Sequence, residues 1–285
     1  MYESLNKQTF RDFEWLVTND ASTDNTAKIL EDFKNRSDFC TRIIHNKCNK
    51  MVSYNCHNAV EIAHGELMIF IGHDDALVPE ALQILNNTWS KITSSQKAGL
   101  AGIMSNCQDQ NGNLVVDEFP GAPCADYFYE MCIDKNVTGE KLICYRTEVL
   151  REFQFSTIDR YVPESVILYN ISDKYKTFYI NDRLRIYYVN QDGIENLSSF
   201  KKIKYPKGMW YSKLEDINRR FSKMKKHPLL VLRTFLIYLR MSYHAKIPFV
   251  QSLKELNTFY KKMIAFILSP IGYLFSISDH YRKLI

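Results

Sequence analysis

Two adjacent carboxylates follow a fully apolar run of the chain. The run Leu67-Met68-Ile69-Phe70-Ile71 leads through a glycine and a histidine into Asp74 and Asp75. Bringing two carboxylates together is costly unless a cation or hydrogen-bond donors compensate their charge. A hard divalent cation with oxygen ligands, which also binds substrate phosphates, gives that compensation. The pattern therefore predicts a site at which a metal ion and a phosphorylated ligand meet.

A second acidic pair, Asp20 and Asp24, follows the apolar residues 15–17. It lies in Asn19-Asp20-Ala21-Ser22-Thr23-Asp24, whose residue types are common in turns and helix caps. One interpretation is a second part of the same ligand site. The other is that both aspartates only cap the next helix and form an Asx turn. This structural alternative is weaker for residues 74–75, because a buried strand running straight into two charges needs a reason for them.

The elements that must position these carboxylates alternate between strands and helices. Short apolar runs at 14–18, 41–45, 67–71 and 99–105 predict strands, and helical periodicity is present at 25–33, before Gly65 and after Pro79. Runs that are apolar throughout are typical of strands buried on both faces of a mainly parallel sheet. The alternation predicts a doubly wound α/β fold, whose ligands bind at the carboxyl ends of the strands.

The second half of the chain has a different texture. Residues 109–113 predict a hairpin turn, residues 187–189 predict a strand, and the chain beyond Lys201 is mainly helical and basic. We therefore expect one α/β domain over residues 1–200 and a basic, amphipathic helical region over residues 201–285.

Composition indicates a folded globular protein in a reducing compartment. The chain has 285 residues, 46% of them hydrophobic and 24% charged, and a net charge of +5. Its seven cysteines are scattered without a CxxC pair, which argues against a disulfide scaffold and structural zinc. The N-terminus lacks the apolar core of a signal peptide. Neither GxGxxG nor GxxxxGK[ST] occurs, which disfavours a simple nucleotide-binding protein. The late basic residues favour an anionic surface, and no nucleic acid is expected.

Several motifs resemble glycosyltransferase family 2 in order and spacing over most of residues 3–190. Gln8–Glu14 and Asn19–Thr26 are similar to the family's Q-T-[FY]-x-D-[FW]-E and D-D-G-S-T-D-x-T. Gly65-Glu66-Leu67, then residues 70–75 and Pro79, resemble G-E-[YL]…L-D-x-D-D-x-x-x-P, which contains the DxD metal motif. The resemblance implies a Rossmann-like GT-A fold. It also implies an inverting transferase of bacterial cell-surface polysaccharide synthesis, using a nucleotide-sugar donor.

The resemblance also implies a donor site. In the family, the aspartate matching Asp20 binds the nucleoside, and Asp24 belongs to the same motif. The aspartates matching Asp74 and Asp75 bind the ribose-diphosphate and its Mn²⁺ or Mg²⁺. Family members also support the nucleotide with an asparagine near residues 55–58, so Asn58, and less directly Asn55, is a candidate. The nucleotide-sugar half, for UDP, would span about 1–108 and the acceptor half about 109–200.

The chain departs from the family pattern in three places. Asn19 replaces the first aspartate of one pair, and Gly72 replaces the first aspartate of DxD, which reduces the carboxylates around the metal. His73 could supply a nitrogen ligand, although a structural histidine is the commoner case. The family begins with an apolar strand and a P-[TS]-[YF]-N loop, whereas this chain starts inside the following helix. A nucleotide-sugar-binding protein that has lost turnover is therefore the alternative function.

An inverting transfer needs a carboxylate that takes the proton from the acceptor hydroxyl as it attacks the sugar. Residues 161–165 and 174–181 resemble the family's [GP]-E-[DG]…K-Y-K…Y-I-N-E-x-L-R-x-Y region. The resemblance makes Glu164 the candidate base and Asp159 its nearest rival. The structural alternative for Glu164 is a glutamate of a surface loop.

Two further residues are candidates for binding the acceptor, a saccharide or a lipid-linked saccharide. Thr138-Gly139-Glu140-Lys141 resembles the acceptor-side loop of the family, so Glu140 could contact an acceptor sugar. Arg185 lies in a strand-like segment that the family places near the cleft. It could equally make a structural ion pair.

Two apolar stretches lie in the C-terminal region, at 228–241 and 263–277. Both have lysines and arginines around them, and neither comfortably reaches the roughly 20 apolar residues that span a bilayer. We therefore expect interfacial helices that hold the protein at the cytoplasmic face of the membrane. The alternative is that these helices pack on the catalytic domain or on a sister subunit of an oligomer.

Overall fold

The computed structural model describes residues 1–115, 117–188 and 203–281. The chain divides into two compact units. One comprises residues 1–155 and the described part of 167–193, and the other comprises 156–166 and the described part of 194–285. Residues 156–166 thus belong with the C-terminal helices, whereas the sequence alone suggested a boundary near residue 200.

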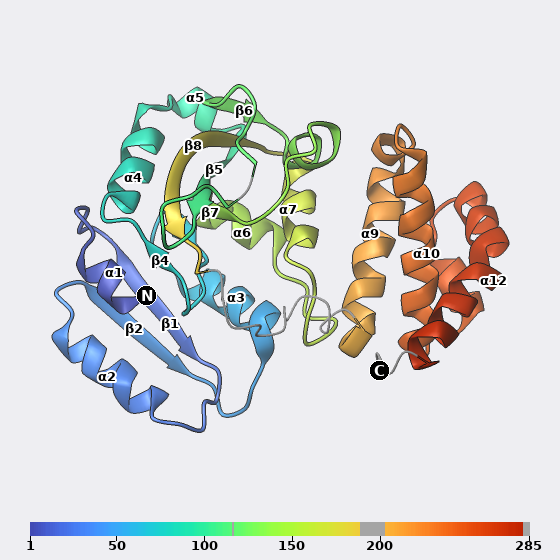
Figure 1. The fold of residues 1–285 in the computed structure, drawn as a ribbon, viewed down its shortest axis with the longest axis horizontal. Helices are drawn as coiled ribbons and strands as arrows, with labels where there is room; N and C mark the ends of the chain where they lie inside the picture. The colour runs from blue at the N-terminus through green and yellow to red at the C-terminus, as the bar shows by residue number, and fades with distance from the viewer. Residues whose placement is uncertain (116, 189–202, 282–285) are drawn as a thin grey trace. The chain divides into compact units, whose positions relative to one another are not determined.

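A two-stranded parallel sheet stands at the N-terminal end of the first unit. It consists of β1 (Glu14–Asn19) and β2 (Cys40–His45), which are connected through α2 (Thr26–Arg36). Figure 1 shows α2 lying against these strands. The short helix α1 (Tyr2–Asn6) brings Tyr2 into a stack with Phe33 of α2, with ring centroids 3.9 Å apart. The strands and the helix expected in this region are confirmed.

The remaining strands form a six-stranded mixed sheet. Its order is β3 (Leu67–Ile69), β7 (Lys141–Arg146), β5 (Leu100–Gln108), β8 (Lys176–Ile186) and β4 (Ala76–Leu77), with β6 (Cys124–Asp126) also beside β8. Only β5 and β8 pair in parallel among these described strands, whereas the sequence suggested mainly parallel pairing. After β5 the chain turns back at 109–113 and passes through β6 before it reaches β7, which pairs antiparallel with β5. It reaches β8 after two helices, which allows parallel pairing.

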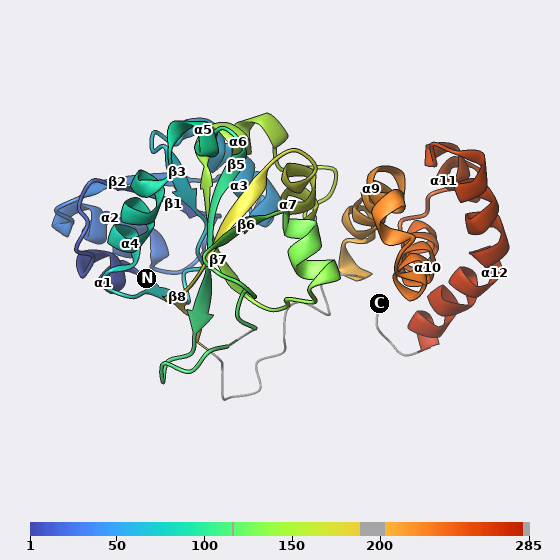
Figure 2. The same cartoon turned by 90° about the horizontal axis from the view of Figure 1, so that it is seen from above.

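Helices cover both faces of this sheet (Figures 1 and 2). On one face, α4 (Ala81–Lys91) packs Leu85 and Trp89 into a cluster with Ile103 and Leu142 of the strands. The other face is covered by α3 (Met51–Ile62), α6 (Thr147–Phe153) and the part of α7 (Ser165–Ser172) that belongs to this unit. The short helices α5 (Ser94–Lys97) and η1 (Glu130–Asp134) lie in the connections. The α/β expectation is confirmed.

The two sheets share one apolar cluster without joining. Trp15 of β1 and Leu67 and Ile69 of β3 pack against the same buried residues. Within the described residues β1 pairs only with β2, and β3 only with β7. The strand that the family resemblance implies in the middle of the sheet is not among the described elements.

Two local expectations have different outcomes. The turn at 109–113 is confirmed, because Asp109 N donates to Asn113 O at 2.8 Å and Gln108 bridges to Leu114. The strand expected at 187–189 is wrong for Tyr187 and Tyr188, since β8 ends at Ile186, where its pairing with Ala76 and Gln108 ends. Val189 lies outside the described residues.

The second unit is helical, as the sequence predicts. It contains α9 (Pro206–Met224), α10 (Pro228–His244), α11 (Phe249–Glu255) and α12 (Phe259–Tyr281), which enclose a third apolar core. The helices α10 and α12 approach closely, because a Cβ on Gly272 would stand 2.7 Å from Cβ of Leu239. Arg240 and His244 of α10 also bind the buried carboxylate of Asp279, His244 Nε2 at 2.7 Å.

The helix α12 is longer than the sequence suggests. It continues through Pro270 and Gly272, at which the apolar stretch was expected to break. Over Phe259–Asp279 it is long and apolar enough to cross a bilayer by length and composition, the single such helix in the described chain. The expectation that this stretch falls short of a span is therefore corrected.

Candidate active site

Asp75 is a buried carboxylate held by a cation from a distant strand. It follows β3 in the connection to β4, and it is 4% exposed. The pairing of Leu77 with Arg185 brings the end of β8 beside this connection. Arg185 donates from Nε at 3.1 Å and from Nη2 at 2.6 Å to Asp75 Oδ2. Burial raises the pKa of Asp75, and the charge of Arg185 offsets only part of the rise.

Asp74 joins Asp75 beside a glycine. A Cβ on Gly72 would stand 2.5 Å from Asp74 Oδ1 and 3.1 Å from Asp75 Oδ2. The two carboxylates therefore converge on the space that a side chain at position 72 would fill. The charge of Asp74 adds to the raised pKa of Asp75.

This arrangement fits a divalent ion that is shared with a phosphorylated ligand. Mg²⁺ and similar ions are commonly bound by one or two carboxylates, with substrate phosphates and waters as the other ligands. Asp74 and Asp75 supply that number. Within the described chain no group of three or more His, Cys, Asp or Glu side chains could hold a metal ion. These two carboxylates thus suit an ion that is held jointly with a diphosphate. His73, the possible nitrogen ligand, is exposed.

The two acceptor candidates contact each other. Nη1 of Arg185 lies 3.6 Å from Oε2 of Glu140, whose side chain is half exposed. The structural ion pair left open for Arg185 is present, and its closest carboxylate is Asp75. An acceptor role for Glu140 and Arg185 stays a prediction. We call Asp74, Asp75, Arg185 and Glu140 the Asp75 cluster.

A half-buried lysine lies next to this cluster and was not predicted. Lys141 Nζ donates to Asn106 Oδ1 at 2.8 Å and to Asp117 O, and it lies 4.3 Å from the ring centre of Phe119. Burial lowers the pKa of Lys141 to about 8. Its backbone carbonyl accepts from Arg185 Nη1 at 3.4 Å. The sequence feature that could have indicated this polar site is Asn106, which directly follows the predicted strand 99–105.

Asp20 is satisfied by neutral donors. Its carboxylate accepts hydrogen bonds from Asn46 Nδ2 at 2.8 Å and from the backbone N–H groups of Lys50 at 2.7 Å and Met51 at 2.8 Å. Asn46 also donates to Asn55 Oδ1 at 2.7 Å. Partial burial raises the pKa of Asp20, but these hydrogen bonds outweigh it, so the pKa lies below its usual value. We call Asp20, Asn46, Asn55 and the start of α3 the Asp20 cluster.

The Asp20 cluster contains a residue that the sequence interpretation missed. Asn46 directly follows β2, so the rule that ligands bind at the carboxyl ends of parallel strands could have found it. Asn58 lies three residues beyond Asn55 on α3 and makes none of these hydrogen bonds. Asp24 is exposed and accepts from Thr26 N at 3.0 Å, as the Asx-turn alternative predicted.

The two candidates for the catalytic base belong to the second unit and differ in their surroundings. Glu164 is exposed directly before α7, and its charge adds to the effect of burial in raising the pKa of Tyr161. Asp159 accepts from Arg160 N at 2.7 Å and from Gly208 N, in the first turn of α9, at 3.0 Å. Asp159 thus acts as a cap for α9.

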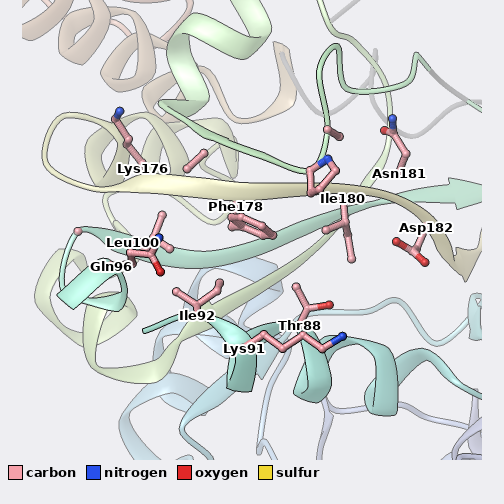
Figure 3. A pocket seen from close by; sticks show the side chains of 14 residues that line it. Thr88, Lys91, Ile92, Gln96, Leu100, Lys176, Phe178, Ile180, Asn181 and Asp182 are labelled. Carbon is pink, nitrogen blue, oxygen red and sulfur yellow. The ribbon is translucent and has the colours of Figure 1, made fainter. Parts of the chain in front are cut away.

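A cavity of about 940 Å³ lies elsewhere in the first unit. Figure 3 shows Phe178 and Ile180 of β8 on one side and Thr88 and Ile92 at the end of α4 on the other. The cavity also reaches Leu100, so it adjoins the amino ends of β5 and β8. None of the predicted site residues lines it.

Known proteins are similar to this chain in sequence and in fold. Residues 1–96 match the family model "Glycosyl transferase family 2". A curated relative from Campylobacter jejuni, "GalNAc(5)-diNAcBac-PP-undecaprenol beta-1,3-glucosyltransferase", is 24% identical over 249 residues, which are 86% of this chain and 77% of that protein.

Solved structures have the same fold at low sequence identity. Residues 1–349 of S. aureus TarS align with a TM-score of 0.55 and 15% identity over all of this chain and 78% of that one. The same fragment was solved in complex with UDP, with a TM-score of 0.53 and 16% identity over 99% of this chain and 87% of that one. The mannosyltransferase PcManGT from Pyrobaculum calidifontis, solved with GDP-Man and Mn²⁺, aligns with a TM-score of 0.56 and 14% identity. The alignment covers 99% of this chain and 76% of that one.

The mixed sheet, its helical layers and the helical C-terminal region correspond to the GT-A fold of these solved structures. The motifs of the chain specify the family more closely. Sequence similarity supports glycosyltransferase family 2, because its model matches residues 1–96 and the relative that covers 86% of this chain is a glucosyltransferase.

Proposed function

We propose that this glycosyltransferase transfers a sugar from a UDP-sugar, with inversion, to a saccharide carried on a membrane lipid. The product would serve cell-surface polysaccharide synthesis. The convergence of Asp74 and Asp75 beside Gly72 is the observation that most directly supports binding of a nucleotide-sugar donor. The relative named for a PP-undecaprenol saccharide supports the acceptor class, and TarS with UDP supports the donor.

The donor would be bound by the two acidic clusters of the first unit. Asp74 and Asp75 would hold Mn²⁺ or Mg²⁺, which supplies neutralising charge to the leaving diphosphate. The Asp20 cluster offers amide and carboxylate groups for a nucleoside, with Asp24 and Asn58 as further candidates. Glu140 is the proposed acceptor contact.

Glu164 is the proposed general base. It is an exposed carboxylate, as a group that meets an acceptor hydroxyl must be. Its rival Asp159 accepts hydrogen bonds from the backbone of Arg160 and Gly208 and caps α9, which gives it a structural role.

The test combines UDP binding with turnover of UDP-sugars. Calorimetry should detect UDP binding to the full chain that tightens with Mn²⁺, and hydrolysis or transfer should be measurable with a panel of UDP-sugars. Glu164→Gln should keep UDP affinity and lower the rate by about 10²–10⁴-fold. Near-wild-type turnover of that variant would assign the base elsewhere, and Asp159→Asn would be next. UDP binding without any turnover would favour the binding-protein alternative, which the missing carboxylate at Gly72 motivates.

We further propose that the second unit attaches the enzyme to the cytoplasmic face of the membrane as a peripheral protein. One side of α12 packs on α10 through Gly272 and Asp279. The opposite side exposes large apolar residues at helical spacing: Phe259, Met263, Phe266, Ile267, Ile271 and Leu274. Leu229 of α10 and Val250 of α11 are exposed as well. A helix that keeps one side on a protein core suits the bilayer surface better than a free span.

Positive charge complements this apolar surface. Arg233, Lys246 and Lys254 are exposed on or next to the same helices. Near an anionic bilayer each such cation contributes about 1 kcal/mol, and salt screens this part of the attraction. The partner is therefore a bilayer with anionic lipids.

Vesicle sedimentation tests this attachment. The full chain should sediment with phosphatidylglycerol-containing vesicles, and salt should weaken but not abolish the binding. Ile267→Glu and Leu274→Glu should each release most of the protein, whereas Ser222→Glu on the exposed side of α9 adds the same charge and should not. Indifference of the full chain to vesicles, or equal sedimentation of all variants, would refute the attachment. A concentration-dependent dimer that only Ile267→Glu and Leu274→Glu dissociate would assign the surface to a second copy.

A further inference from the structure

Arg185 binds Asp75 in a one-sided way. Two of its nitrogens, Nε and Nη2, donate to the same oxygen, Asp75 Oδ2, and Nη1 donates to the backbone carbonyl of Lys141. The guanidinium is fixed by the pairing of β8 with β4, while the carboxylates lie in the turn closed by Asp75 N donating to Gly72 O at 3.3 Å. Arg185 therefore holds Oδ2, the same oxygen of Asp75 that faces position 72 beside Asp74.

Arg185 cancels part of the negative charge of Asp74 and Asp75, which is unusual for a metal site. The family resemblance implies a carboxylate at position 72, and the glycine there leaves two carboxylates, Asp74 and Asp75. Arg185 adds one positive charge, and its side chain is only 13% exposed. These three side chains together carry about one negative charge, and the half-exposed Glu140, 3.6 Å from Arg185, adds a further carboxylate at the edge of the cluster. A pair of carboxylates without Arg185 would repel a diphosphate more strongly and attract a divalent ion more strongly.

We propose that Arg185 is the built-in counter-cation of Asp74 and Asp75, and that it makes binding of the donor diphosphate partly independent of a divalent ion. The inference rests on the proposed function, because it concerns how the same site meets a nucleoside diphosphate. Arg185 acts through Asp75 as a positioning residue. It lowers the affinity of the site for the ion and reduces repulsion of the diphosphate when no ion is bound.

The measured quantity is the ratio of two UDP dissociation constants, one in EDTA and one with saturating Mn²⁺. Arg185→Gln should weaken UDP binding in EDTA and lower the Mn²⁺ concentration needed for half-maximal effect. The ratio should rise at least about tenfold, which corresponds to about 1.4 kcal/mol. Arg185→Lys keeps the charge but loses the two-nitrogen contact, so its ratio should stay closer to that of the wild type.

Arg183→Gln is the matched control. Arg183 lies two residues earlier on β8, its side chain is 40% exposed, and it lies 4.0 Å from Glu118, outside the Asp75 cluster. This variant should keep the wild-type ratio. Circular dichroism of each variant checks that the fold is intact.

The outcomes separate a charge role of Arg185 from a purely structural role, and both from failure of the proposed function. If Arg185 only fastened the turn, Arg185→Gln would weaken UDP binding equally in both conditions, and an unchanged ratio would overturn the inference while the proposed function stands. An Arg185→Lys ratio as high as that of Arg185→Gln would also overturn it, because charge would not be the cause. Absence of UDP binding to the wild-type chain in either condition would remove both proposals.

Discussion

Asp20 and Asp75 both follow strands of the first unit, yet their charges are balanced in different ways. Asp20 accepts hydrogen bonds from neutral groups, two of them backbone N–H groups at the start of α3. Asp75 is balanced by Arg185, which lies 110 residues away in the sequence. The neutral donors favour the ionised form of Asp20 and so lower its pKa. The balance at Asp75 depends on charge, so a cation or a phosphate can change it. We therefore expect the Asp20 cluster to behave as a rigid platform and the Asp75 cluster to respond to ions.

The largest expected difference between the clusters is in the dependence of UDP binding on metal. Asp74→Ala and Asp75→Ala should each remove most of the tightening that Mn²⁺ causes, a loss on the order of 100-fold, because a bound ion is worth several kcal/mol to a diphosphate. Asp20→Asn should weaken UDP binding by a similar factor with and without Mn²⁺. Calorimetric titration of UDP in both conditions measures this. Unchanged metal-dependent affinity in both alanine variants would remove Asp74 and Asp75 from the site.

A second, smaller difference is in stability. Asp20→Asn should lower the free energy of unfolding by about 1–2 kcal/mol, since the amide replaces one acceptor oxygen with a donor that faces N–H groups. Urea unfolding at pH 7 measures the change. Asp24→Asn, at an exposed turn, is the matched control and should change stability less. Equal effects of the two substitutions would mean that the hydrogen bonds of Asp20 carry no special weight.

The pH dependence of this stability has a defined sign. The pKa of Asp20 is lowered in the fold, so near its usual value of 3.8 the unfolded chain binds more protons than the folded chain. The contribution of Asp20 is present above that pH and is lost as the pH falls through the lower pKa of the folded state. The stability difference between wild type and Asp20→Asn should therefore shrink below about pH 4. A difference that grows on acidification would contradict the assigned hydrogen bonds.

The contrast between the clusters also marks what the sequence could predict. The apolar runs at 14–18, 41–45 and 99–105 predicted β1, β2 and β5, because strand burial leaves a local signal. The Asx turn at Asp24 was one of two interpretations left open, and its signal was also local, in the turn-forming residue types around Asp24. The contact of Asp20 with the start of α3 was not, since it depends on how a helix that begins 31 residues later is placed.

Contacts that depend on the pairing register of the strands could not be predicted from the sequence. The ion pair of Arg185 with Asp75 requires β8 to end beside β4, and β4 has only two residues, too few for an apolar pattern. The antiparallel placement of β7 depends on the path of the chain after β5, which local periodicity does not record. The continuation of α12 through Pro270 was missed because proline usually ends or kinks a helix.

The smallest expected effect concerns Lys141, the desolvated cation next to the Asp75 cluster. Burial lowers its pKa to about 8, so between pH 8 and its usual 10.5 the unfolded chain holds a proton that the folded chain has begun to release. The stability contributed by this group therefore rises with pH in that window, opposite to the effect of a lysine stabilised by an ion pair. Urea unfolding at pH 7.5, 8.5 and 9.5 should show that Lys141→Met removes this rise. Lys174→Met is the matched control, because hydrogen bonds with Glu152 and Tyr175 raise the pKa of Lys174 and move its titration above the window. If Lys141→Met and Lys174→Met change the slope alike, Lys141 is solvated like any surface lysine.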